Sequence, residues 1–90
     1  GNAFDVVAER RQTDYEVVSD YVREVAFEVK IRNHKDEDVV VRVVEPMAFD
    51  WKVISASHPH EKADARTLEF KVPVPKGKEA KLAYRVRIKF

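Results

Sequence analysis

One short segment gathers most of the side chains that could bind a metal. His58, His60, Glu61 and Asp64 lie within seven residues, and zinc accepts both imidazole and carboxylate groups as ligands. A zinc site needs three or four such groups that converge tetrahedrally. Two histidines on either side of Pro59 in a loop do not provide that geometry. The segment therefore predicts a solvated loop that Pro59 stiffens, and we expect no metal site.

A second cluster is purely acidic. Asp36, Glu37 and Asp38 follow one another directly, and carboxylates are the oxygen ligands that calcium takes. Calcium needs six to eight oxygens, however, and its loops usually contain a glycine at the sharp turn. This stretch has three acids and no glycine. It favours a plain hairpin turn, and no cofactor is expected here.

The end of the chain carries a basic stripe. Arg85, Arg87 and Lys89 share one face of an extended segment, which taken alone suggests a surface that follows phosphates. Acidic residues occupy equivalent outward positions on other predicted strands: Glu24, Glu28 and Glu69. Cross-strand ion pairs explain both sets. The formal net charge is only +1, so we expect no nucleic-acid partner.

Trp51 is the only tryptophan. An exposed Trp51 near Tyr15 or Tyr21 would offer a stacking platform for sugars. Two-sheet proteins more often bury their tryptophan between the sheets. The core position is therefore the prediction, and the carbohydrate platform is the alternative.

Catalytic chemistry has little to build on in this chain. The absence of cysteine excludes disulfides, zinc–thiolate sites and thiol nucleophiles. There is no GxSxG, P-loop, GxGxxG or HExxH motif. We expect no enzyme and no catalytic residue. Apolar runs reach only three residues, against the roughly 20 that a membrane-spanning helix needs, so no membrane span is expected.

The elements that position these residues are strands. Residues 24–32, 68–74 and 80–90 alternate apolar side chains with charged residues, alanine or proline. Successive side chains of a strand point to opposite faces, so this alternation puts the apolar groups on one side. A helix would scatter the same residues around its axis. Strands with one polar face are typical of antiparallel sheets with one solvated side.

Further strands are predicted from composition. Residues 39–45 and 51–55 are rich in β-branched and aromatic side chains. The run 39–44 is apolar on both faces apart from its arginine, which indicates a more covered strand. Residues 4–10 and 15–18 are expected to form an interrupted or bent strand pair.

Turn formers separate these strands. Residues 33–38 join two of them, and Pro46 ends the strand before it. Pro75 and Gly77 occupy the second and fourth positions of a predicted type I turn, which would join the last two strands as a hairpin. Residues 57–66 are expected to be the longest loop, which could include a helical turn.

Together these elements predict one all-β domain over residues 1–90. The chain is 44% hydrophobic, enough for a core of its own. About seven short strands with a turn every ten residues or so are typical of a two-sheet antiparallel immunoglobulin-like β-sandwich.

The chain also resembles a known family along its whole length. Residues 1–14 resemble the start of the C-terminal domain of unknown function in bacterial mucoidy-inhibitor-like proteins. Five further segments resemble that family in order and spacing: residues 32–37, Asp50-Trp51-Lys52-Val53, residues 57–62, Thr67-Leu68-Glu69-Phe70 and Tyr84-Arg85-Val86-Arg87. The resemblance implies a C-terminal all-β module with no known activity and no catalytic residues. The stretch from Phe49 to Trp51 lacks the glycine often seen there in that family, so a different local turn is expected.

The hypothesis is therefore a non-catalytic structural or protein-interaction module, excised from the C-terminal end of a larger bacterial envelope-associated protein. The resemblance alone favours the cell envelope or periplasm. The expected partners are other domains of the same parent chain, a protein partner, or a second copy paired through the edge strand in residues 4–18. The alternative is a carbohydrate- or cell-wall-binding module that uses exposed aromatic side chains.

Overall fold

The computed structural model describes residues 5–90, which form strands joined by short turns. This part of the chain contains no helix that is long and apolar enough to cross a membrane. The seven strands are β1 (Val6–Ser19), β2 (Val22–Asn33), β3 (Val39–Pro46), β4 (Asp50–Ala56), β5 (His60–Asp64), β6 (Thr67–Val74) and β7 (Glu79–Lys89).

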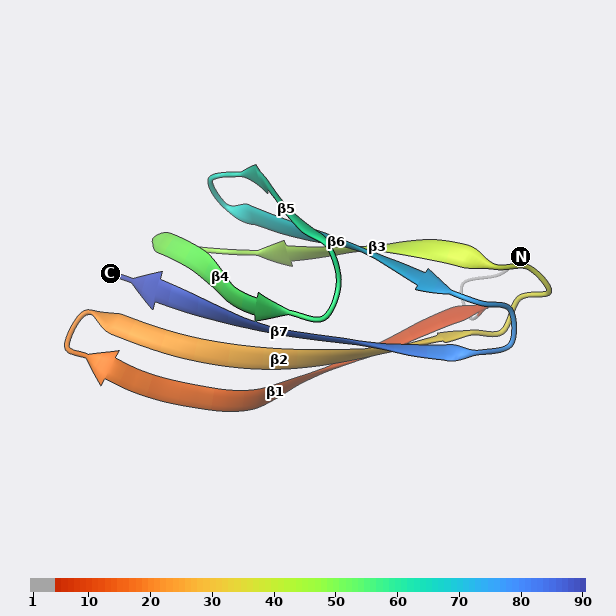
Figure 1. Ribbon diagram of the computed structural model, residues 1–90, viewed down its shortest axis with the longest axis horizontal. Helices are drawn as coiled ribbons and strands as arrows, with labels where there is room; N and C mark the ends of the chain where they lie inside the picture. Colours follow the sequence, from red (N-terminus) through yellow and green to blue (C-terminus); the bar gives the residue numbers. More distant parts are fainter. Residues whose placement is uncertain (1–4) are drawn as a thin grey trace.

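The strands form two sheets. Sheet A has the order β1-β2-β7-β4 and sheet B has the order β3-β6-β5. All neighbouring strands are antiparallel. Figure 1 shows the sheets as two layers of an elongated molecule. The predicted two-sheet antiparallel sandwich of seven strands is confirmed. The strand order differs from that of a constant-type immunoglobulin domain, because β7 lies in sheet A and β5 in sheet B, where that domain has the fifth and the seventh strand.

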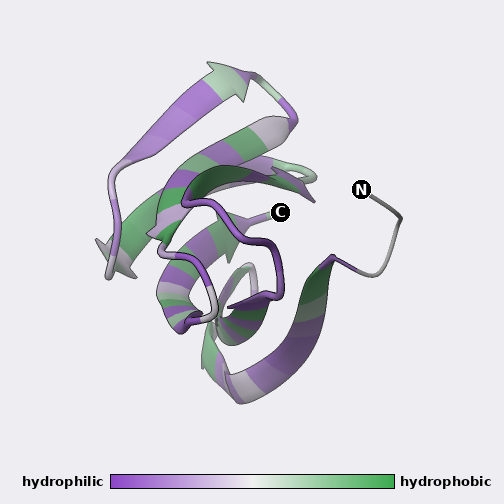
Figure 2. Cartoon of the chain, turned by 90° about the vertical axis from the view of Figure 1, so that its right-hand side faces the viewer, coloured by the Kyte–Doolittle hydropathy of each residue, from purple (hydrophilic) through white to green (hydrophobic). Residues whose placement is uncertain are grey.

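The core lies between the sheets, where the alternation places it. Figure 2 shows the alternation as hydrophobic and hydrophilic bands along the strands. The inward side chains of β2, β6 and β7 are buried, because these strands lie inside their sheets and face each other across the sandwich. The core residues are Val25, Val29, Ile31, Trp51, Leu68, Phe70, Val72, Val74, Leu82, Tyr84 and Val86.

The front of the chain differs from the sequence prediction. Residues 6–19 form one continuous strand instead of two pieces, and Phe4 lies outside the described residues. The polar stretch after Arg10 stays extended because its backbone pairs with β2 throughout. A β-bulge between Gln12 and Asp14 absorbs one extra residue. The interruption seen in the sequence is therefore a bulge in a strand that is solvated on both faces.

The predicted loop over residues 57–66 is also wrong in part, because it contains β5. This strand pairs with β6 from His60 to Asp64. All five of its residues are exposed, so no apolar alternation marks the strand in the sequence. The pairing partner, and not the side-chain pattern, makes this segment extended.

The two predicted hairpin turns are crossovers between the sheets. β2 and β7 belong to sheet A, whereas β3 and β6 belong to sheet B. Residues 33–38 and the turn at Gly77 therefore each carry the chain from one layer to the other. The amide of Lys78 donates to the carbonyl of Pro75 over 3.0 Å. This bond puts Gly77, with φ 66°, at the third position, as in a type II turn.

Asn33 ties these two crossovers together. Its buried side-chain amide donates to the carbonyls of Glu37 and Val74 over 2.8 and 3.0 Å. Its backbone amide donates to the carbonyl of Lys78. The buried amide of Asn33 thus has its hydrogen-bond partners, as buried polar groups require.

β3 is not the covered strand that its apolar sequence predicts. It is an edge strand of sheet B, paired with β6 alone. Val39, Val41 and Val43 point toward the core, whereas Val40 and Val44 are exposed on the outer face. The alternation of a strand reports which residues share a face, but it does not report whether a neighbour covers that face.

Candidate interaction surfaces

The outer face of sheet A is a ladder of ion pairs centred on Arg85. Its guanidinium contacts Glu24, Asp14 and Glu16 at 2.6, 2.6 and 2.8 Å. Arg87 also contacts Glu24 at 2.6 Å. The register explains the cluster, because Glu24 lies opposite both Glu16 of β1 and Arg87 of β7. The predicted cross-strand ion pairs are confirmed for these arginines.

These contacts change the titration of the acids. The Arg85 guanidinium, followed by that of Arg87, lowers the pKa of Glu24 below its ordinary value. Arg85 likewise lowers the pKa of Asp14. Glu24 is buried even though it sits on the outer face, because the two arginines cover it. The arginines of the basic stripe are thus already occupied by carboxylates.

The same face carries further pairs along its length. Arg32 binds Glu79 at 2.6 Å, and Glu28 lies between Arg11 and Lys81 at 3.6 and 3.7 Å. The remaining residue of the predicted stripe, Lys89, is opposite Asp50 in the register. Mixed charge of this density makes the outer face of sheet A a well-solvated surface.

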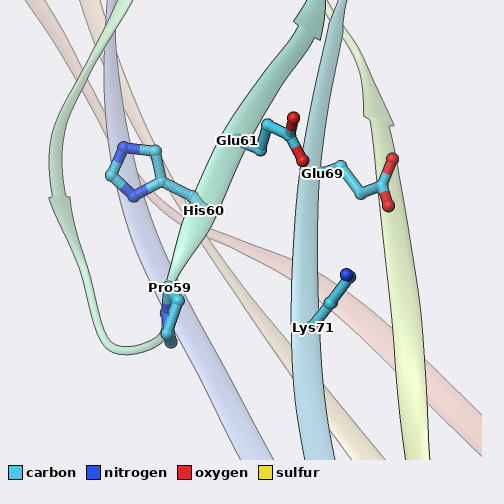
Figure 3. Close-up of a pocket in the computed structure, with 5 residues that line it drawn as sticks. All are labelled: Pro59, His60, Glu61, Glu69 and Lys71. Carbon is cyan, nitrogen blue, oxygen red and sulfur yellow. The ribbon is translucent and has the colours of Figure 1, made fainter.

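The histidine segment does not assemble a metal site. The Nδ1 atom of His58 lies 2.7 Å from the hydroxyl of Ser57. Asp64 accepts a hydrogen bond from the Arg66 amide over 2.8 Å, and this bond lowers the pKa of Asp64. Figure 3 shows His60 and Glu61 on opposite sides of β5. Within residues 5–90, no three histidine or acidic side chains gather closely enough to hold a metal ion.

The segment does border a shallow depression of about 130 Å³ on sheet B. It is lined by Pro59, His60, Glu61, Glu69 and Lys71. Glu61 and Glu69 face each other across β5 and β6. His60, two carboxylates and one ammonium thus lie around a shallow depression on an open sheet surface.

The acidic loop is also structural. Asp38 accepts a hydrogen bond from the backbone amide of Lys76 over 2.8 Å, and Glu37 lies 3.6 Å from the ammonium of Lys35. Asp38 therefore links one crossover to the other, whereas Glu37 pairs within its own loop. The three acids do not act as one set.

Trp51 is buried at 4% exposure, which confirms the core prediction and removes the stacking platform. Its indole donates to the carbonyl of Ala65 over 2.8 Å, and the ammonium of Lys62 lies 4.6 Å from its ring. The tryptophan thus holds the β5–β6 hairpin onto sheet A.

An ion pair with a buried carboxylate joins the two sheets, and it was not predicted from the sequence. Glu45 of β3 is buried, and Arg10 of β1 donates to it over 3.2 Å. The Arg10 guanidinium also lies 3.9 Å from the Phe27 ring centre. Glu45 lies on the inward face of β3, in line with Val39, Val41 and Val43. A charged residue in this apolar alternation is the sequence signal that could have predicted the ion pair.

The hydroxyl of Tyr84 is buried beside this pair. Burial, reinforced by the charge of Glu45, raises the pKa of Tyr84 well above its ordinary value. The hydroxyl makes no hydrogen bond of normal geometry. Tyr84 therefore stays neutral at any physiological pH.

Exposed aromatic rings gather at one end of the sandwich. Phe49 packs edge-on against Phe90, with ring centres 4.9 Å apart and an interplanar angle of 79°. The amide of Phe90 donates to the carbonyl of Tyr21, another exposed aromatic residue. Because the two phenylalanine rings are nearly perpendicular, they do not form a flat platform for a sugar.

Phe49 is unusual in its backbone. Its φ is 65°, in the left-handed region that glycine favours, and its side chain is 67% exposed. Phe49 therefore holds a conformation that glycine adopts freely, at a cost in backbone strain.

Four strands have an open edge among the described residues: β1 and β4 in sheet A, and β3 and β5 in sheet B. The edges of β1 and β3 lie on the same side of the molecule, because Arg10 and Glu45 link them. β1 is the longest, and all of its residues except Val6 are exposed.

Comparisons with known proteins add no relative to this description. No family model matches the chain, and neither the curated proteins nor the solved structures provide a match.

Proposed function

We propose that the chain is a non-catalytic structural and protein-interaction module of a larger bacterial envelope-associated protein, and that it associates through its open strand edges. The observation that carries this proposal is β1. It runs for 14 residues and pairs with β2 on one side only. The other side presents backbone donors and acceptors that another strand can use.

The distribution of the charged groups supports a role without catalysis. The arginines of sheet A are held by carboxylates, and His60 and Glu61 lie on opposite sides of β5. A catalytic site needs titratable groups that converge in a cleft with shifted pKa values. The family resemblance of the sequence supports the assignment to a longer bacterial parent protein.

The charges of β1 favour a second copy as one partner of this edge. Glu9, Arg10 and Arg11 lie in its first half, which is basic on balance, whereas the second half carries Asp14 and Glu16 and no base. Antiparallel pairing about a two-fold axis brings the basic half of one copy beside the acidic half of the other. Such complementarity selects a specific partner and disfavours indiscriminate pairing.

Light scattering over a concentration series from about 10 μM to 1 mM tests this proposal. The wild-type mass is expected to approach that of a dimer, whereas a Val7→Lys, Val17→Lys variant should stay monomeric, because lysines on an edge oppose pairing. Val40→Lys with Val44→Lys, on β3, is the matched control and should dimerise normally. A wild-type monomer at the highest concentration would rule out self-association through β1.

A further inference from the structure

β3 is the one open edge among the described strands that runs without a bulge, and Pro46 and the inward-pointing Glu45 guard only its last two positions. Natural proteins guard open edges with bulges, charges or short strands. β1 and β4 contain bulges, and β5 is five residues long and mostly charged. β3 pairs with β6 over eight residues without a register shift. Its outward side chains are Val40, Arg42, Val44 and Pro46.

The sequence of β3 is apolar on both faces, but the fold covers only one of these faces. Its valines occupy both faces, a pattern typical of strands that are covered on both sides. The core covers the inward face, but Val40 is 66% and Val44 is 48% exposed. Single exposed valines are ordinary, whereas two on a flat open edge form a surface suited to another strand.

We propose that β3 is the docking edge for an extended segment of a protein partner whose outward side chains read apolar, acidic, apolar. The inference rests on the proposed function, because it names the edge and the partner chemistry for association by strand addition. The added strand continues the backbone hydrogen bonds of sheet B. Its two apolar side chains lie beside Val40 and Val44, and its acidic side chain lies beside Arg42.

The charges around Arg42 select the acidic residue. Its Nε atom lies 2.8 Å from Glu69, and Lys71 is its direct neighbour on β6. Arg42 and Lys71 therefore lie side by side, Glu69 contacts Arg42, and Glu61 lies opposite Glu69 one strand further along the sheet. Arg42 is 67% exposed at its side chain, and a guanidinium has five donors. A carboxylate on an added strand meets donors that Glu69 leaves open.

A second copy of the chain fits this edge poorly. In a two-fold antiparallel pairing of β3 with itself, the register that sets Val40 opposite Val44 also sets Arg42 opposite Arg42 of the second copy. Like charges directly opposite each other are destabilising. If the pairing register is shifted by two residues in either direction, Arg42 lies opposite Val40 or Val44 of the second copy. Charge complementarity therefore points to a different chain.

Fluorescence polarisation with a labelled peptide, Lys-Thr-Val-Thr-Glu-Thr-Val-Thr-Lys, tests the proposal. A counterpart with lysine in place of the glutamate reports the charge preference. We expect the wild-type domain to bind the glutamate peptide at least about tenfold more tightly, a difference of about 1.4 kcal/mol. Arg42→Glu should reverse the preference.

Two double variants that introduce no charge show which strand edge binds the peptide. Val40→Ser with Val44→Ser should abolish binding, whereas the matched pair on β1, Val7→Ser with Val17→Ser, should retain it. All four side chains are exposed, so circular dichroism and thermal melting should show intact folds.

Three results would overturn the inference. Equal affinity for both peptides, or no binding at about 1 mM, would remove the acidic strand as the occupant. If only the β1 serine pair lost binding, the peptide would bind at β1 and not at β3. Association through strand edges, which is the proposed function, would still stand. Loss of the wild-type dimer in the β3 serine pair would make a second copy the occupant.

Discussion

At the scale of single residues, the buried carboxylate of Glu45 is the clearest departure from an apolar core. Ionised groups are seldom buried unless a partner compensates them. Arg10 supplies that compensation from the neighbouring sheet while its own side chain remains half exposed. The pair therefore fastens the exposed strand β1 to sheet B at a point where few other side chains connect them.

Removal of Arg10 should cost more than removal of its neighbour. Arg10→Ala leaves a buried carboxylate without its donor, and we expect the free energy of unfolding to fall by about 1–3 kcal/mol. Arg11→Ala, which breaks a 3.6 Å pair on the surface, should change it by less than about 0.5 kcal/mol. Urea denaturation measures both.

A double variant tests whether the loss in Arg10→Ala comes from the unpaired carboxylate of Glu45. Arg10→Ala combined with Glu45→Leu removes both charges, and replacing both partners of a buried pair is often close to neutral. The double variant should recover most of the lost stability. Equal losses in the single and double variants would contradict this account.

Phe49 is the second residue with a local conflict. A left-handed backbone costs a residue with a side chain about 1–2 kcal/mol, and the edge contact with Phe90 returns about 0.5–1.5 kcal/mol. Phe49→Gly removes both terms, so we expect the free energy of unfolding to change by less than about 1 kcal/mol. Ala48→Gly, without a positive φ to relieve, should lose about 0.5–1 kcal/mol.

Thermal melting of the two glycine variants checks this prediction. A loss above about 2 kcal/mol in Phe49→Gly would show that the phenylalanine stabilises the fold. The expected result would show instead that an exposed aromatic side chain is carried on a strained turn without benefit to stability. Interaction sites are where such strain is most often found.

At the scale of elements, the ladder on sheet A makes stability depend on acid. Glu24 and Asp14 have lowered pKa values in the folded state because of Arg85. Their stabilisation is complete above the ordinary carboxylate pKa, near 4, and is lost as the pH falls through the lowered values. The free energy of unfolding should therefore decline as the pH is brought from about 5 toward 2.

Arg85→Gln should make this acid decline shallower, because the two carboxylates return toward their ordinary pKa values. Part of the decline should persist, since Arg87 still binds Glu24. Lys81→Gln is the matched control, because it removes one positive charge from the same face, where Lys81 lies 3.7 Å from Glu28. Its free energy of unfolding should decline with acid as steeply as that of the wild type. Urea unfolding between about pH 2 and pH 7 measures the slopes, and parallel curves for Arg85→Gln and the wild type would contradict the assignment.

At the scale of the whole molecule, the sandwich separates a charged face from two pairing edges. The outer face of sheet A is saturated with ion pairs, whereas the open edges of β1 and β3 lie together on one side. The linked pair Arg10 and Glu45 joins these two edges across the layers. A strand bound to β3 would therefore lie next to the free edge of β1, so both proposed contacts use the same side of the sandwich.

Much of this fold could be predicted from residues with a strict period of two. Phe70, Leu82 and Val86 lie inside because their neighbours in sequence are charged or small, and only one face of each strand can be apolar. The inward position of Trp51 follows from the same preference for burial. The ion pairs of Arg85 and Arg87 were predictable as a class, because acids and bases occupied outward positions on different strands.

The sequence alone determined which side chains share a face, since alternation is a local property of an extended backbone. Only the tertiary structure decided which strands are neighbours, because pairing joins backbones that are distant in the chain. Strand β5, the crossovers at Asn33 and Gly77, the open edge of β3 and the partner of Glu45 all depend on such neighbours. The surfaces proposed for association belong to this second group, because an edge exists only where the fold leaves a strand without a partner.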